Sequence, residues 1–160
     1  MKRQLAFALA TLLAAAVPFT AALAQDAGED QVYQVDADDP VMDAAIAEAQ
    51  RTLPDFLALL AEPPAGTSEF MIKYPLAGWE HIWVDNLTIE GEAIAGALAN
   101  TPVEEGYQFG QRVSVPLAEI SDWAYRAANG VMQGHRTTRV LLGQAPDEMA
   151  AAILADFGWD

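Results

Sequence analysis

The sequence predicts an α+β fold, with a helical segment at the start, a twisted and mostly antiparallel sheet, and a helix at the end. Two observations predict it. Apolar residues recur at helical spacing over residues 40–61 and again over 146–158. Between these regions, short apolar runs with period two alternate with turn residues, which is typical of consecutive antiparallel strands. Such a sheet is either open or curled into a partial barrel.

The first 24 residues have the layout of a secretory signal peptide. Lys2 and Arg3 give a positive start, an apolar stretch runs from Leu5 to Phe19, and the small-residue pattern 22–24 precedes Gln25. The apolar stretch is shorter than the roughly 20 residues of a membrane span. We therefore expect cleavage after Ala24 and a periplasmic or secreted protein with no membrane span.

The next part, residues 25–36, reads as an acidic flexible leader, within which residues 32–35 could add an edge strand. A single domain is expected over residues 37–160. Asp38 or Asp39 can cap its first helix, because Pro40 suits the first helical turn. Pro54 leaves two arrangements open: two short helices, or one helix with a kink. The run 62–66, EPPAG, ends the helical region.

Strands follow in order. Period-two alternation predicts a strand from Ser68 to Pro75, and two more runs surround Glu90-Gly91 within residues 80–99. Residues 111–115 form another strand, 116–121 a turn, and 122–135 a hairpin around Asn129-Gly130. A helix with Met149, Ile153 and Phe157 on one stripe ends the chain.

The pairing of the central hairpin can be argued from its turn. With Glu90-Gly91 as a two-residue loop, Trp83 and Leu87 share a face with Leu98, and this face holds the larger side chains. That register predicts that Trp83 faces the core, with His81 at its rim. A three-residue loop with a bulge at Gly91 would shift the pairing by one.

Composition excludes several functions. The chain has 23 acidic and 8 basic residues, a formal charge of −15, so nucleic acid is not an expected partner. It has no cysteine, and therefore packing alone must hold an exported fold. No glycine-rich phosphate loop, GxSxG elbow or calcium loop is present, and His81 and His135 lack metal-ligand spacing. We predict no cofactor, no metal and no catalytic constellation, and a monomer.

The remaining candidate residues are aromatic or titratable. His81, Trp83, Asp122 and Trp123 are the predicted ligand-binding residues, because tryptophan is favoured at binding sites and His81 starts an apolar strand. Core packing is the competing interpretation for the tryptophans, and a hydrogen-bonded structural histidine is the competing interpretation for His81. The alternative function is a hydrolytic enzyme that uses His81 with Asp85 or Asp122 as acid and base.

Four segments together carry a resemblance to a known family: 39–57, 81–84 (HIWV), 96–102 (GALANTP) and 120–134 (ISDWAYRAANGVMQG). In order and spacing they resemble the YegJ-like family, a bacterial domain of unknown function, over roughly residues 31 to 157. The resemblance implies a small α+β domain, exported or joined to other modules, and it carries no catalytic residues. We expect a non-enzymatic binding or interaction module with an unknown protein or small-molecule partner.

Overall fold

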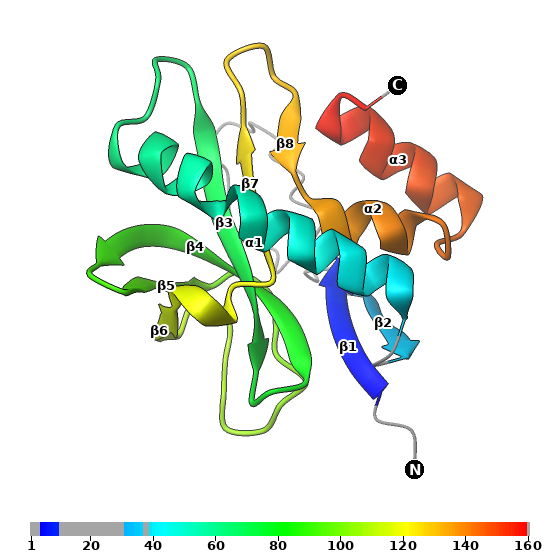
Figure 1. The fold of residues 1–160 in the computed structure, drawn as a ribbon. Coiled ribbons are helices and arrows are strands. Elements are labelled where there is room, and N and C mark those ends of the chain that lie inside the picture. The colour runs from blue at the N-terminus through cyan, green and yellow to red at the C-terminus, as the bar shows by residue number, and fades with distance from the viewer. Residues whose placement is uncertain (1–3, 10–30, 37–38, 160) are drawn as a thin grey trace, which may run out of the picture.

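The structure is a computed structural model of the chain, and it describes residues 4–9, 31–36 and 39–159 (Figure 1). The strands and helices of these residues are β1 (Gln4–Leu9), β2 (Gln31–Asp36), α1 (Pro40–Ala61), β3 (Ser68–Leu76), β4 (Glu80–Glu90), β5 (Ala93–Leu98), β6 (Arg112–Pro116), β7 (Asp122–Arg126), β8 (Met132–Gly134), α2 (Arg136–Leu142) and α3 (Asp147–Phe157). A short 3-10 turn, Leu117–Glu119, lies between β6 and β7. The predicted α+β class, with its N-terminal and C-terminal helices, is confirmed.

The sheet is open and mostly antiparallel, as predicted. Its strands follow the order β2-β1-β4-β3-β7-β8, and β5 and β6 form a branch that starts from β4. The pair β1–β4 is parallel and the other described pairs are antiparallel. β3 pairs with the first half of β4 and β5 with its second half, and the sheet bends strongly around that strand (Figure 1).

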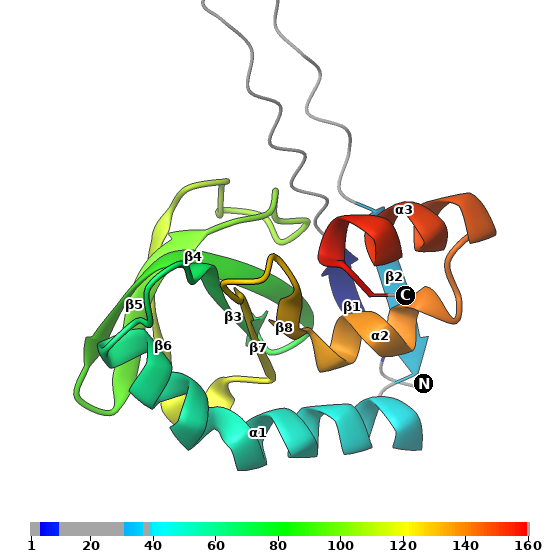
Figure 2. The same cartoon turned by 90° about the horizontal axis from the view of Figure 1, so that it is seen from above.

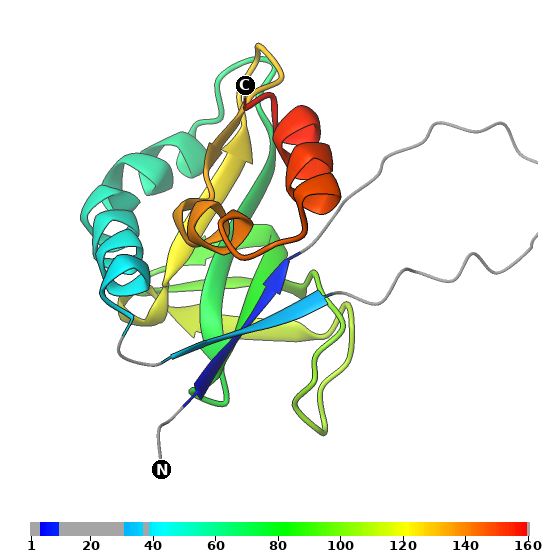
Figure 3. The ribbon, with the colours of Figure 1, turned by 90° about the vertical axis from the view of Figure 1, so that its right-hand side faces the viewer.

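Helices cover both faces of the central strands. Figures 2 and 3 show α1 on one side of β3 and β7 and α3 on the other. Ala49, Leu53 and Phe56 of α1 pack on a cluster that includes Ile72, Ile82 and Val84. On the opposite face, Ile153 and Phe157 of α3 pack with Met71, Trp83 and Met132. The described residues therefore form one core on each side of a shared sheet, and Met42 and Leu141 form a third, smaller cluster between α1 and α2.

α1 is one continuous helix with Pro54 inside it, which settles the two arrangements left open. Asp39 is its N-cap: the Asp39 Oδ1 atom accepts from the backbone N–H of Val41 at 2.8 Å and of Met42 at 3.3 Å. The helix ends at Ala61, directly before the predicted stop. None of the helices in the described residues is long and apolar enough to cross a membrane.

The predicted register of the central hairpin is wrong. Glu90 pairs with Ala93, so the turn residues are Gly91 and Glu92. Gly91 has φ +64°, and a type II′ turn places glycine at this first central position. Alternation along β4 places Ile82 and Val84 toward α1 and Trp83 toward α3. Residue size could not reveal the face, because helices bury both faces: Trp83 is 1% and Val84 0% exposed.

Later elements agree with the sequence except at one place. β7 and β8 form the predicted hairpin, with Asn129-Gly130 inside its loop. α3 carries the predicted stripe, although no side chain caps its N-terminus. No helix was expected at α2, because its residues, RTTRVLL, include β-branched threonines and no helix-start signal. It begins after His135, which has a left-handed backbone, φ +52°.

The N-terminal strands bear on the export prediction. β2 includes residues 32–35, where an edge strand was expected, and it is the edge strand of its arm. β1 lies within the predicted signal peptide and pairs with β4 at Glu80 and His81. The predicted cleavage site after Ala24 and the first half of the predicted leader lie outside the described residues, as does Asp38.

Candidate functional site

The strands β3 and β4 separate at one end. Their pairing runs from Leu76–Glu80 to Ile72–Val84 and goes no further. Beyond that point β3 pairs with β7, and β4 pairs with β5. Both strands have an irregular register where they part, between Ser68 and Met71 and between Asp85 and Thr88. These bulges turn the strand ends apart. We call this place the fork.

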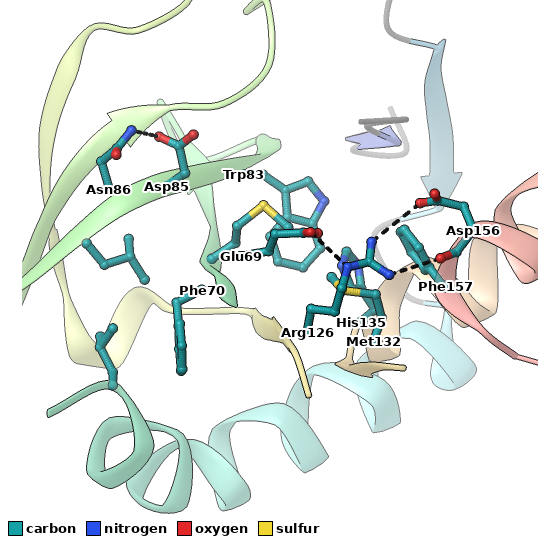
Figure 4. A pocket seen from close by; sticks show the side chains of 13 residues that line it. Glu69, Phe70, Trp83, Asp85, Asn86, Arg126, Met132, His135, Asp156 and Phe157 are labelled. Carbon is teal, nitrogen blue, oxygen red and sulfur yellow. Dashed lines mark hydrogen bonds and ion pairs between the residues drawn. The ribbon is translucent and has the colours of Figure 1, made fainter. Parts of the chain in front are cut away.

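A cavity of about 370 Å³ occupies the fork (Figure 4). Its apolar wall comes from Leu60, Phe70, Met71, Trp83, Leu87, Met132 and Phe157, and its polar groups belong to Glu69, Asp85, Asn86, Arg126, His135 and Asp156. These residues come from α1, β3, β4, β7, β8 and α3 and from the residue before α2. The size and the apolar wall with a few polar groups are typical of a small-molecule site. We call it the fork cavity.

Backbone strain accompanies both bulges. Glu69 has φ +55° and Asn86 has φ +50°, and both side chains line the fork cavity. Asparagine enters this left-handed region readily, whereas glutamate does so at a cost. Strained residues of this kind gather at binding and catalytic sites, because the surrounding structure holds them in place for a purpose. Of the four described non-glycine residues with positive φ, Glu69, Asn86 and His135 line the fork cavity, and Ala77 lies in the turn between β3 and β4.

Arg126 ties three elements together at the cavity rim. Its Nε donates to Glu69 Oε1 at 2.8 Å, and its Nη1 donates to the carbonyl oxygens of Gly130 at 2.9 Å and Asp156 at 3.0 Å. Figure 4 shows the guanidinium between Glu69 and Asp156. The hydrogen bond that Arg126 donates to Glu69 raises the pKa of Arg126, so the guanidinium stays charged. Arg126 therefore holds the end of α3 against β3 and β7.

His135 lies deeper in the cavity wall. It is 2% exposed, and its ring centroid lies 4.5 Å from that of Trp83 and 4.6 Å from that of Phe157. The Nδ1 atom is 3.1 Å from Thr138 Oγ1, while Nε2 has no hydrogen-bond partner among the described residues. Burial, and then the charges of Lys73, Arg139 and Arg126, hold the pKa of His135 well below its usual range. The imidazole is therefore neutral near pH 7.

His81 lies elsewhere. It is 5% exposed, its Nδ1 is 2.8 Å from Ser121 Oγ, and that hydroxyl also lies 3.2 Å from the carbonyl oxygen of Lys73. Burial lowers the pKa of His81 to about 3, and the nearby Lys73 adds to the shift. Glu80, its neighbour, turns to other partners: its carboxylate accepts from the backbone N–H groups of Val103 and Glu104. The two side chains do not act as a pair.

Asp122 is part of a buried polar network. Its Oδ2 accepts from the backbone N–H of Thr137 at 2.8 Å and from Thr137 Oγ1 at 2.7 Å. The Lys73 Nζ atom donates to the same hydroxyl at 3.0 Å. Burial lowers the pKa of Lys73 to about 8 and raises the pKa of Asp122, although each opposes the shift of the other. The network joins β3, β7 and α2 inside the protein.

Of the four predicted ligand-binding residues, Trp83 is the one that lines the fork cavity. His81 and Asp122 lie in the buried networks just described. Trp123 packs on α1: its Nε1 donates to the carbonyl oxygen of Ala49 at 3.1 Å, and its ring stacks on Phe56. The structure does not bring the four together.

The predicted ligand-binding residues leave out most of the cavity residues, among them Glu69, Arg126, His135 and Asp156. One signal was available, since Asn86 interrupts an apolar strand with a residue that strands disfavour. The others become neighbours only when the strands part. No group of three or more His, Asp or Glu residues within the described ranges could hold a metal ion.

Comparisons with known proteins give a family and two relatives. A family model described as "Uncharacterized protein conserved in bacteria (DUF2314)" matches residues 39–160. The uncharacterized protein YegJ of Escherichia coli strain K12 is 27% identical over 122 residues, which cover 74% of this chain and 78% of YegJ. A protein of Neisseria meningitidis serogroup B, named for ankyrin repeats, is 35% identical over 82 residues, 51% of this chain. The match spans 32% of that relative's length. No solved structure is significantly similar to the chain.

Proposed function

The chain belongs to the DUF2314 family of uncharacterized bacterial proteins, and on this premise we propose that it is a non-enzymatic binding module for a small, mostly apolar molecule. The ligand occupies the fork cavity. Its apolar body contacts Trp83, Phe157 and Met132, and it enters beside Arg126 at the rim. The proposed binding surface is thus the fork cavity, and the proposed partner is a small molecule.

The cavity between two strained bulges carries the proposal. A sheet whose two strands simply continued their pairing would bury more apolar surface and satisfy more backbone groups. Instead, Glu69 and Asn86 take left-handed backbone conformations that open a space lined by Trp83 and Met71. We take these strained residues, which lie on both sides of a space of small-molecule size, as support for a bound molecule.

The hydrolytic alternative has less support. His81 contacts Ser121 inside the protein and does not line the fork cavity. Asp85 lies four residues further along the same strand, about 13 Å away at the usual rise of a strand. Asp122 receives its hydrogen bonds from Trp123 and Thr137. An acid and a base with open space beside them would favour hydrolysis, and these contacts do not provide that space.

A cavity-filling substitution tests the proposal. Leu87 lines the fork cavity, whereas Ile89, two residues further along β4, does not. We expect the uncharged fluorophore N-phenyl-1-naphthylamine to bind the wild-type protein at one saturable site. Leu87→Trp should weaken its binding by about tenfold or more, because the larger side chain fills the space. Ile89→Trp, the matched control, should leave binding unchanged.

Fluorescence titration of the three proteins measures this. No saturable binding to the wild-type protein, or equal loss in both variants, would count against the fork cavity as the ligand site.

We further propose that the protein acts in the periplasm or after secretion. The basic start, the apolar stretch and the Ala22-Leu23-Ala24 pattern support export. The acidic charge supports a protein that avoids non-specific association there.

A further inference from the structure

The chemical class of the ligand can be argued from the polar groups of the fork cavity, and this step rests on the function proposed above. We propose that the ligand is an uncharged amphiphile, whose apolar body fills the cavity and whose single hydroxyl or amide group forms a hydrogen bond with His135 Nε2.

The first observation is the buried histidine. Nε2 of His135 lacks a hydrogen-bond partner among the described residues, and buried polar groups in folded proteins normally have one. Rings of Trp83, Phe157 and Trp159 surround the imidazole, at centroid distances of 4.5, 4.6 and 6.1 Å. In apolar surroundings, a nitrogen without a hydrogen-bond partner destabilises the folded state more strongly. A ligand group that meets this nitrogen would remove that cost.

The position of His135 makes the contact possible. The residue lines the fork cavity, and Figure 4 shows Met132 beside it at the wall. Nε2 itself is covered, so the contact requires a neighbouring side chain to move, and we infer that this is Met132, which lines the same cavity. An unbranched thioether changes rotamer easily and adapts to different neighbours. The bound state would thus exchange a methionine contact for a hydrogen bond.

The second observation is the charge of the rim. Glu69, Asp85 and Asp156 contribute three carboxylates, and Arg126 contributes one guanidinium. Arg126 already donates to Glu69 and to two backbone carbonyl groups. An anionic ligand would therefore meet net negative charge at the entrance, and it would find a neutral imidazole inside.

A neutral head group fits the imidazole whichever nitrogen carries the proton. If Thr138 donates to Nδ1, Nε2 is a donor, and if Nδ1 donates to Thr138, Nε2 is an acceptor. A hydroxyl or an amide can donate or accept, so either tautomer is satisfied. An ammonium group can only donate, and it would have to leave the carboxylates of the rim to reach the nitrogen.

Four molecules with the same naphthalene body separate these possibilities: 2-naphthalenemethanol, 2-naphthoate, 2-(aminomethyl)naphthalene and 2-methylnaphthalene. Isothermal titration calorimetry on the full chain gives their affinities. We expect 2-naphthalenemethanol to bind about tenfold more tightly than 2-methylnaphthalene, because it supplies one hydrogen bond to an unpaired group. It should also bind more tightly than the anion and the cation.

Two variants test whether His135 is the residue that recognises the hydroxyl group of the ligand. His135→Phe should bind 2-naphthalenemethanol and 2-methylnaphthalene equally, because the ring remains and the nitrogen is gone. His81→Phe replaces the other buried histidine, which lies outside the cavity, and should keep the tenfold difference. An NMR measurement on the wild-type protein needs no variant: the ring ¹⁵Nε2 signal of His135 should shift with 2-naphthalenemethanol and stay in place with 2-methylnaphthalene.

The outcomes distinguish the two proposals. If none of the four molecules binds, the fork cavity is not a ligand site and both proposals fail. If 2-naphthoate or the amine binds most tightly, the cavity is a ligand site but the ligand class is wrong. Equal binding of 2-naphthalenemethanol and 2-methylnaphthalene to the wild-type protein likewise overturns the role of His135.

Discussion

At the scale of single residues, the described part of this protein is unusual in how many titratable groups it buries. Lys73, Glu80, His81, Asp122 and His135 are each 5% exposed or less. Residues of these types are rarely buried to this degree without partners. Here the first four have hydrogen-bond partners in the protein, whereas the Nε2 atom of His135 has none among the described residues. Within this set, His135 is the position where a ligand would complete the structure.

The buried histidines predict a loss of stability in mild acid. Burial and the nearby Lys73 lower the pKa of His81 to about 3 in the folded protein, against 6.5 in the unfolded chain. Below pH 6.5 the unfolded chain binds a proton that the folded protein does not, so the free energy of unfolding falls as the pH falls. Between pH 7 and pH 5 this amounts to about 2 kcal/mol for His81.

His81→Gln removes that titration. Its free energy of unfolding should therefore fall by about 2 kcal/mol less between pH 7 and pH 5 than that of the wild-type protein. Urea denaturation at the two pH values measures the difference. His135 and Asp122 titrate in both proteins, so their contributions cancel. An identical fall in both proteins would show that His81 is protonated when folded.

At the scale of elements, β4 is the strand on which the site depends. Its first half pairs with β3 and its second half with β5, and the bulge around Asn86 divides the two. The extra residue puts Leu87 on the core that also contains Val84, three positions earlier, instead of on the other face. Strict alternation would have closed the fork. The bulge therefore determines both the register and the cavity.

Gly96 of β5 makes this bulge possible. A Cβ atom at position 96 would lie 2.5 Å from the Asp85 carbonyl oxygen and 2.4 Å from Val84 Cγ1. Gly96→Ala should therefore destabilise the protein by about 3 kcal/mol, because a backbone atom would have to move. It should also weaken N-phenyl-1-naphthylamine binding, since the fork shares this backbone.

Gly143→Ala is the matched control. Gly143 has φ −66°, and an added Cβ would come no closer than 3.4 Å to Val140 O. We expect this variant to be as stable as the wild-type protein or about 0.5 kcal/mol more stable. Chemical denaturation measures the free energy of unfolding of both variants. Equal values for Gly96→Ala and Gly143→Ala would mean that the backbone of β4 adapts freely at the bulge.

At the scale of the whole molecule, the proposed export would change the N-terminal arm of the sheet. The buried residues of the described clusters all follow residue 41. Removal of residues 1–24 would leave all of these residues in the chain. It would remove β1, and with it the pairing of β1 to β4 at Glu80 and His81 and to β2. That edge of the sheet would then lack these pairings in the processed protein.

We predict that the exported protein begins at Gln25. The full chain, produced in a Gram-negative host, should appear in the periplasmic fraction with the intact mass of residues 25–160. Ala22→Glu together with Ala24→Glu should block processing, because the peptidase requires small residues at these positions. Unprocessed wild-type protein in the cytoplasm would contradict the export proposal.

Local physics, readable in the sequence, determined the α+β class, the capped first helix, the successive hairpins and the final helix. Asp39 and Asn129-Gly130 act over a few neighbouring residues, so their effects needed no knowledge of the fold. The tertiary structure alone decided which way Trp83 points, since helices cover both faces of the sheet and a bulge interrupts the alternation. It also decided the site. Glu69, Arg126, His135 and Asp156 come from four separate places in the chain, and only the parting of β3 from β4 brings them around one space.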